Sequence, residues 1–111
     1  MENGKKLSAF VKSLPLDSTD YFQILGENQT RTMRSGLVTL KPGENVGEHS
    51  TKSYEEMLVI LNGKGEAEIV GNERIKIEKG QIVYIPPNTA HNVFNNSDIF
   101  LQYIYIVAKA E

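Results

Sequence analysis

The 111-residue chain contains no cysteine and only two histidines. The absence of cysteine excludes disulfide bonds, thiolate zinc sites and cysteine nucleophiles. Any metal site in this chain must therefore use nitrogen and oxygen ligands. Imidazole, the commonest nitrogen ligand, is available only at His49 and His91.

The chain also has little net charge and no long apolar run. Its net charge is −2 and its pI is about 5.7, so the basic stripe of a nucleic-acid binder is absent. We interpret the neighbouring Arg31 and Arg34 as solvated strand residues. Two lysines near the N-terminus precede an apolar patch, as in a signal peptide, but Lys12 and Pro15 interrupt that patch. We therefore expect a cytoplasmic protein with no nucleic-acid and no membrane partner.

Helical periodicity is nearly absent, and frequent turn signals predict a different class of fold. Short segments rich in Val, Ile, Leu, Tyr and Phe alternate with these signals, which favours an all-β sandwich or barrel with little helix. Only the first fifteen or so residues have a weak helical pattern. The turn signals are residues 25–28, 41–45, 62–65, 71–73, 79–80, 86–88 and 95–98. The length predicts a single domain, 1–111, with residues 1–20 as an N-terminal arm or packing segment.

Two segments, 55–63 and 100–108, are apolar on both faces. In the first, Leu58 and Ile60 share a face with Glu56, while Met57 and Val59 take the other. Strands covered on both sides require an outer layer or a subunit interface. We expect a homodimer that buries the outer face; the alternative is that residues 7–16 fold back over it.

Polar residues interrupt this pattern where the segment around Glu56 begins. His49 and Thr51 have the same parity, so their side chains point to one face of an extended segment. If Glu56 faces the same interior, the buried carboxylate needs a cation and the buried imidazole needs a partner. A divalent metal ion satisfies both, and His91, which also follows a Gly/Pro-rich turn, supplies a second imidazole.

The spacing of these residues resembles the first motif of the cupins. That motif is a glycine, five residues, His-x-His, three or four residues, a glutamate, six residues and a glycine. Here Gly43, His49, Glu56 and Gly63 match it, and Thr51 stands where the second histidine belongs.

A second segment resembles the other cupin motif, a glycine, five residues, Pro-x-Gly, two residues, a histidine, three residues and an asparagine. Gly80, Pro86, His91 and Asn95 match at every spacing, with Asn88 in place of the middle glycine. Asparagine tolerates positive φ better than other non-glycine residues. Residues 43–95 carry both motifs, and the resemblance implies an antiparallel β-barrel, the double-stranded β-helix or jelly roll.

The resemblance also implies a metal site, because cupins with the full set bind a metal through three histidines and a glutamate. His49, Glu56 and His91 remain, a set of two imidazoles and one carboxylate that suits Fe(II) as well as Mn, Zn, Ni or Cu. Thr51 is expected to contact a metal-bound water or a substrate, or to serve only in strand packing. For Asn95 a turn role is the simpler interpretation, and Glu55 is expected to face outward.

Two functions are consistent with these residues. The first is a metal-dependent reaction of the dioxygenase, isomerase or decarboxylase type on a small organic molecule. The alternative is a non-catalytic module that binds a small ligand, for example a sugar or metabolite, with or without metal. No separate general base is visible, and the sequence does not choose between an enzyme and a binding module.

Overall fold

The computed structural model describes residues 6–70 and 73–111, and within them the chain forms nine strands and no helix. The strands are β1 (Phe22–Leu25), β2 (Arg34–Leu40), β3 (His49–Ser50), β4 (Tyr54–Asn62), β5 (Lys64–Ile69), β6 (Glu73–Glu78), β7 (Ile82–Ile85), β8 (Ala90–Phe94) and β9 (Leu101–Lys109). None of the described residues therefore forms a helix that could span a membrane.

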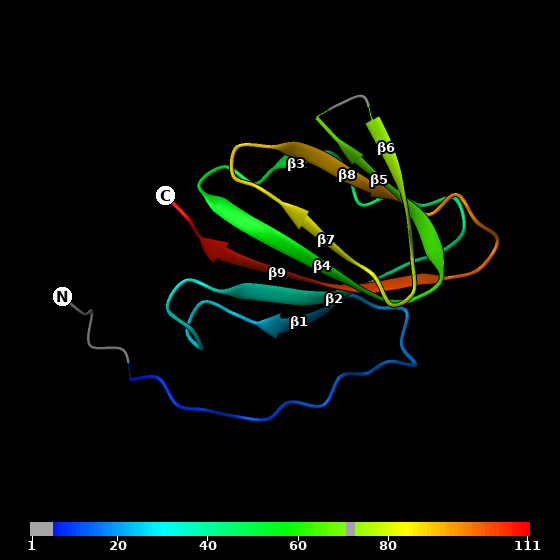
Figure 1. Ribbon diagram of the computed structural model, residues 1–111. Coiled ribbons are helices and arrows are strands. Elements are labelled where there is room, and N and C mark those ends of the chain that lie inside the picture. The colour runs from blue at the N-terminus through cyan, green and yellow to red at the C-terminus, as the bar shows by residue number, and fades with distance from the viewer. Residues whose placement is uncertain (1–5, 71–72) are drawn as a thin grey trace.

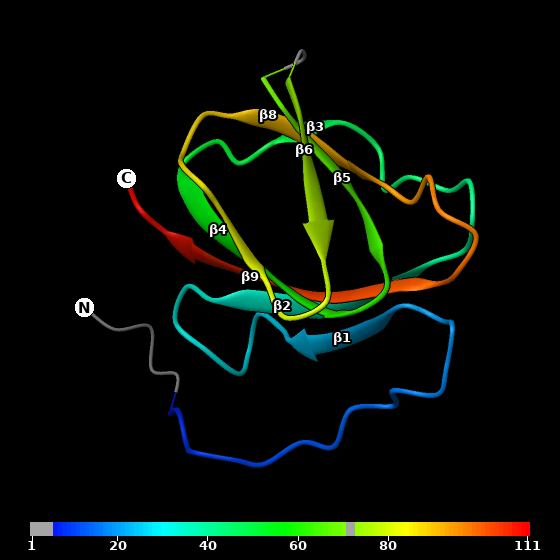
Figure 2. The same ribbon diagram turned by 45° about the vertical axis from the view of Figure 1, so that its right-hand side comes forward.

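The strands form two antiparallel sheets that face each other as the two layers of a double-stranded β-helix (Figure 1). One sheet has five strands in the order β1-β2-β9-β4-β7, and the other has four in the order β3-β8-β5-β6. The view in Figure 2 looks between the two layers. The all-β jelly-roll fold predicted from the sequence is confirmed.

The core lies between the sheets because alternate residues of each strand turn inward. In β4 the buried residues are Glu56, Leu58 and Ile60, whereas Met57 between them is exposed. This parity is the one that the sequence predicts. The central cluster of buried side chains comprises Leu40, Leu58, Ile60, Ala67, Ile77, Ile85, Val93, Leu101 and Tyr103.

Tight turns close the strands where the motif glycines and Asn88 stand. Gly63 has φ of 84°, and a Cβ there would lie 2.1 Å from the carbonyl oxygen of Phe100, so only glycine fits. Asn88 has φ of 55°, the left-handed conformation for which asparagine replaces the motif glycine.

The described part of the N-terminal arm, residues 6–20, is neither helix nor strand. The weak helical pattern of the first fifteen or so residues gives no helix in residues 6–15, and residues 1–5 lie outside the described part. The arm instead attaches through single polar contacts: the Lys12 ammonium donates to the Ile24 carbonyl, and the Gln102 amide donates to the Leu16 carbonyl. Pro15, which cannot donate a backbone hydrogen bond, begins a turn in which the Ser18 N–H donates to the Pro15 carbonyl.

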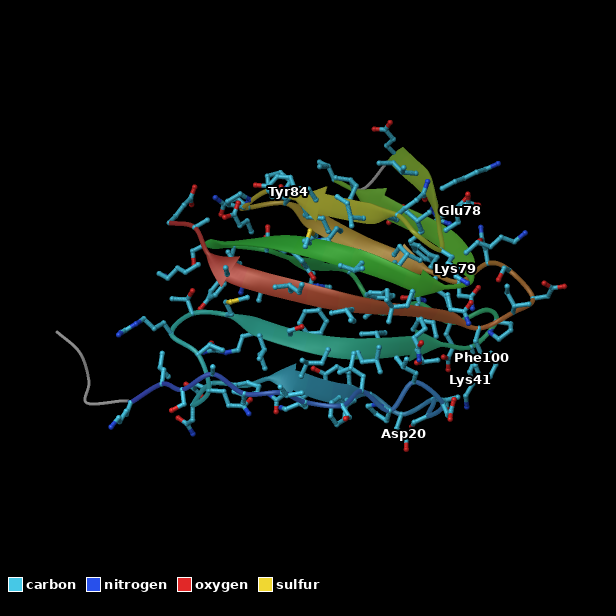
Figure 3. All side chains as sticks on the ribbon, turned by 60° about the horizontal axis from the view of Figure 1, so that its bottom comes forward. Asp20, Lys41, Glu78, Lys79, Tyr84 and Phe100 are labelled. Carbon is cyan, nitrogen blue, oxygen red and sulfur yellow. The ribbon has the colours of Figure 1, made fainter. Side chains whose placement is uncertain are left out.

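The outer face of the five-stranded sheet is covered only in part. Leu37 turns away from the central cavity yet is fully buried, whereas Met57, Ile82 and Tyr84 are exposed at the opposite edge. Figure 3 looks onto this face, with Asp20 at one edge and Tyr84 near the other. The alternative that residues 7–16 fold back over the outer face therefore does not account for the β4–β7 edge, which is left exposed.

Candidate metal centre and cavity

The two histidines lie side by side because β3 pairs with β8. His49 is the direct partner of His91 in this antiparallel pair, and their rings meet edge to face with centroids 4.3 Å apart. Glu56 reaches the same point from β4 in the opposite sheet. The ligand atoms of all three residues lie within 4.8 Å of one another. The structure thus brings together the three residues predicted as metal ligands.

The three residues differ in burial. His91 and Glu56 are 3% and 7% exposed, whereas His49 is an exposed residue at the rim of the cavity. His49 lines the cavity with the other two residues, as its parity predicts, but it is not buried. The reason is that β3 is only two residues long and lies at the edge of the four-stranded sheet. A metal held here would be accessible from the cavity mouth.

Backbone carbonyls orient both imidazole rings. Nδ1 of His49 lies 3.0 Å from the carbonyl oxygen of Gly47, and Nδ1 of His91 lies 3.0 Å from that of Thr89. A carbonyl oxygen only accepts, so each Nδ1 carries the hydrogen, and Nε2 of each neutral ring carries a lone pair. Such contacts at the distal nitrogen hold metal-binding imidazoles in one tautomer.

The remaining nitrogen of His91 faces a second acceptor. Its Nε2 lies 3.0 Å from Oε1 of Glu56 but is not aligned as a directed hydrogen bond requires, and it is buried without another partner. In the neutral ring, a lone pair would oppose a carboxylate oxygen. A proton or a metal cation relieves this opposition, so the residues fit a divalent metal ion.

The pKa of His91 reflects the same surroundings. Burial is the largest single influence and lowers the pKa, but the contact with Glu56, the Thr89 carbonyl and the negative charge of Glu56 together raise it above the ordinary 6.5. Without metal, these surroundings thus favour the protonated imidazole more than water does.

Thr51, in the position of the missing motif histidine, is buried and structural. Its hydroxyl donates to the Pro86 carbonyl at 2.7 Å and accepts from the Thr89 backbone N–H at 3.0 Å. The single hydroxyl proton is therefore already used. This geometry favours the structural interpretation, since Thr51 links the end of β3 to the turn that positions His91.

Two further residues, one inside the second motif and one beside the motif glutamate, lie where the sequence predicts. The Asn95 side chain is buried and donates to the carbonyls of Leu40 and Ile99, which confirms its turn role. Glu55 has the outward parity, and its carboxylate accepts from the Tyr84 hydroxyl at 2.8 Å.

A cavity of about 720 Å³ opens from the candidate metal centre between the sheets. Most of its wall is apolar, as in many small-molecule sites. A wider hollow of about 940 Å³ lies beside β5 and β6, but its lining is rich in charged side chains and contains no imidazole. The cavity with the histidines is lined by Tyr21, Arg34, Val38, Thr39, Leu40, Val46, His49, Ser50, Thr51, Tyr54, Glu56, Leu58, His91, Val93, Tyr103, Tyr105 and Val107.

Strand register arranges the five-stranded wall of this cavity in three rows across β2, β9 and β4. The outermost row is Arg34, Val107 and Glu56; the next is Gly36, Tyr105 and Leu58; the innermost is Val38, Tyr103 and Ile60. Members of a row are direct cross-strand neighbours, so their side chains share the cavity face.

Two tyrosine side chains pack together over Gly36, where there is no side chain. The Tyr21 ring stacks on that of Tyr105 with centroids 6.5 Å apart, and the two hydroxyl oxygens lie 2.7 Å apart. A Cβ on Gly36 would approach the Tyr21 hydroxyl to 2.4 Å and the Tyr105 ring to 2.7 Å. Burial raises the pKa of both Tyr103 and Tyr105 well above 10, so their hydroxyls remain protonated.

Sequence reasoning missed this tyrosine- and arginine-bearing wall. Arg34 is half-buried and lines the cavity, so its interpretation as a simply solvated strand residue is wrong. Tyr21, Tyr103 and Tyr105 received no role, because tyrosine is common in strands. The parity of Arg34 with Gly36 and Val38 is the one signal that would have placed it inside.

Comparison with known proteins agrees with this geometry. Residues 36–107 match the cupin domain, so the chain belongs to the cupin family. An uncharacterized protein of Methanocaldococcus jannaschii is 35% identical over 54 residues. That match spans 49% of this chain and 42% of the relative's length.

Solved structures share the fold. An RmlC-like cupin family protein with a double-stranded β-helix fold from Methanocaldococcus jannaschii has a TM-score of 0.79 at 21% identity, covering 91% of each chain. The cupin domain of Cnp3 from Schizosaccharomyces pombe has a TM-score of 0.76 at 16% identity, covering 87% of this chain and 73% of that one. A predicted oxalate decarboxylase from Thermotoga maritima has a TM-score of 0.65 at 21% identity, covering 68% and 65%.

Proposed function

We propose that this cupin binds a divalent metal ion through His49, Glu56 and His91 and acts with it on a small organic molecule held in the cavity. The observation that carries the proposal is the buried Nε2 of His91. It has no directed partner, it faces a carboxylate oxygen at 3.0 Å, and its ring is fixed by a carbonyl on the opposite side. Two imidazoles and one carboxylate suit iron, manganese, zinc, nickel or copper.

The surroundings support chemistry on a small substrate. A metal ion in such a site supplies Lewis acidity or activates dioxygen. The chain contributes a mostly apolar wall, an exposed His49 that leaves the metal position accessible, and protonated tyrosine hydroxyls in the cavity lining. The reaction classes we propose are those of a dioxygenase, an isomerase or a decarboxylase; the Thermotoga neighbour bears the name of a predicted oxalate decarboxylase.

Metal analysis of untagged protein tests the proposal. We expect a stoichiometric divalent metal ion, and iron or manganese would favour an enzyme over a binding module. Glu56→Gln should lower metal content strongly, whereas Glu55→Gln, which removes an equal charge one residue away on the outer face, should retain it. Absence of metal after growth and refolding with all five metals would contradict the site and leave a metal-free ligand-binding module.

Two broader predictions accompany this function. We propose that two copies pair through the outer apolar face of β4, β9 and β7, where Met57, Tyr84 and Ile106 are cross-strand neighbours and the first two are exposed. Met57→Lys should convert the expected dimer to a monomer in sedimentation equilibrium; a monomeric wild type would contradict the proposed dimer.

We also propose a cytoplasmic location, which fractionation of the source cells tests.

A further inference from the structure

The charged groups that line the cavity are few, and their arrangement specifies a class of ligand. Apart from the candidate metal ligands, Arg34 is the only charged residue that the described part of the chain contributes to the cavity lining. Its guanidinium donates to the Met33 carbonyl, and no carboxylate in residues 6–70 or 73–111 pairs with it. A guanidinium has five N–H donors, so most of its donors remain available at the cavity mouth.

Register places Arg34 directly across the cavity wall from the candidate metal centre. Arg34 is the cross-strand partner of Val107, and Val107 is the partner of Glu56. With strands about 4.8 Å apart, the backbones of Arg34 and Glu56 are separated by roughly 10 Å. Because the carboxylate of Glu56 is engaged with His91, it does not neutralise Arg34.

The charge balance of the loaded cavity favours an anion. A divalent metal contributes two positive charges, Arg34 one and Glu56 one negative charge, which leaves an excess of two positive charges in a largely apolar space. Uncompensated charge is costly in such surroundings, and arginine is the side chain best suited to bind a carboxylate with two parallel hydrogen bonds.

The tyrosine pair adds a hydrogen-bond donor in the row of side chains next to Arg34 and Glu56. The hydroxyls of Tyr21 and Tyr105 share one hydrogen bond, which uses one of their two protons. The other proton is available to a ligand, and Tyr105 occupies the row next to Arg34 and Glu56.

We propose that the cavity binds a small organic acid, with a carboxylate on Arg34 and the Tyr21–Tyr105 pair and a second oxygen function at the His49/Glu56/His91 centre. This inference deepens the proposed function and rests on it for the second contact only. The contact with Arg34 does not need the metal.

Titration calorimetry with a series of dicarboxylates tests the inference. Malonate, succinate and glutarate are each compared with the uncharged diamide of the same length, on protein loaded with Mn²⁺ and on metal-free protein. We expect a dicarboxylate to bind and its diamide to bind at least about tenfold more weakly, as expected when a charge-assisted hydrogen bond is lost.

Variants locate the anion. Arg34→Gln should weaken dicarboxylate binding about ten- to hundredfold while metal content stays unchanged. Arg34→Lys should retain part of the affinity, and Tyr105→Phe should reduce it by a smaller factor. Lys76→Gln, which removes the same charge from an exposed position on β6, is the control and should bind as the wild type does.

The outcomes separate the two proposals. Equal binding of dicarboxylates by wild type and Arg34→Gln, or equal binding of acids and diamides, would overturn the inference even if metal is bound. If no metal binds but Arg34→Gln still loses affinity for the acids, the metal proposal fails and the assignment of Arg34 stands. Thermal unfolding of each variant confirms that it is folded.

Discussion

The two walls of the cavity are built in different ways. On the four-stranded wall, each histidine is oriented by a carbonyl two residues away, Gly47 for His49 and Thr89 for His91. On the five-stranded wall, Tyr105 is positioned by Tyr21, which is 84 residues away in the chain. The orientation of each imidazole ring on the first wall is thus set by a short local segment. The meeting of the two histidines, like that of the two tyrosines, requires distant segments to come together. Functional residues held by contacts close in sequence can be recognised as a sequence motif. Functional residues brought together by strand register cannot.

The largest expected effect concerns the four-stranded wall, which carries the two histidines. His91→Ala should lower metal affinity by about a hundredfold or more, since loss of a partner to a ligand alone costs 10–100-fold. It also leaves the buried Glu56 carboxylate unpaired, at a cost of roughly 3 kcal/mol in the free energy of unfolding. Metal titration and urea unfolding of the metal-free protein measure the two effects.

His49→Ala is the matched control for that variant. His49 is exposed, so its removal should lower metal affinity with little change in the stability of the metal-free protein. Retention of metal by either variant would place the site elsewhere. Equal stability losses in both would contradict the difference in burial on which the comparison depends.

A substitution at Gly36 tests the packing of the two tyrosines on the five-stranded wall. Gly36→Ala should force Tyr21 away from Tyr105, because its Cβ would lie 2.4 Å from the Tyr21 hydroxyl. Overpacking of this kind costs about 1–3 kcal/mol. Urea unfolding gives the cost, and Tyr21→Ala should recover part of it in the double variant. A Gly36→Ala protein as stable as the wild type, with its tyrosine fluorescence unchanged, would contradict the packing described.

The difference between the walls also explains what the sequence predicts. Parity alone places Glu56 with Leu58 and Ile60, and the motif spacing brings His49 and His91 to the same end of the fold. Parity with Gly36 and Val38 gives the face of Arg34, but its position beside Val107 and Glu56 depends on the pairing of β2 with β9, about seventy residues later in the chain. The exposure of His49 was missed for a related reason, since spacing says nothing of where a short edge strand ends.

Thr51 connects the end of β3 to the turn before β8. Substitution of Thr51 should have a smaller effect than the changes above. Thr51→Val keeps the side-chain shape but leaves the Pro86 carbonyl and the Thr89 N–H without their partner, a loss of about 1–3 kcal/mol in unfolding free energy. Metal affinity should change little. Thr51→His restores the fourth cupin ligand and should tighten metal binding. It should lower the free energy of unfolding by a similar amount to Thr51→Val. Unchanged metal affinity in Thr51→His would mean that position 51 does not reach the metal.

The smallest expected effect is a pH dependence of the metal-free protein. The pKa of His91 is raised in the folded state, so its contribution to stability is fully present below the unfolded value of 6.5 and is lost as the pH rises through the folded value. The difference in melting temperature between wild type and His91→Gln should therefore shrink from pH 6 to pH 9. Metal affinity should rise over the same window, because binding displaces the proton from Nε2. A wild type whose advantage over His91→Gln grows with pH would show that Glu56 does not stabilise a protonated imidazole at His91.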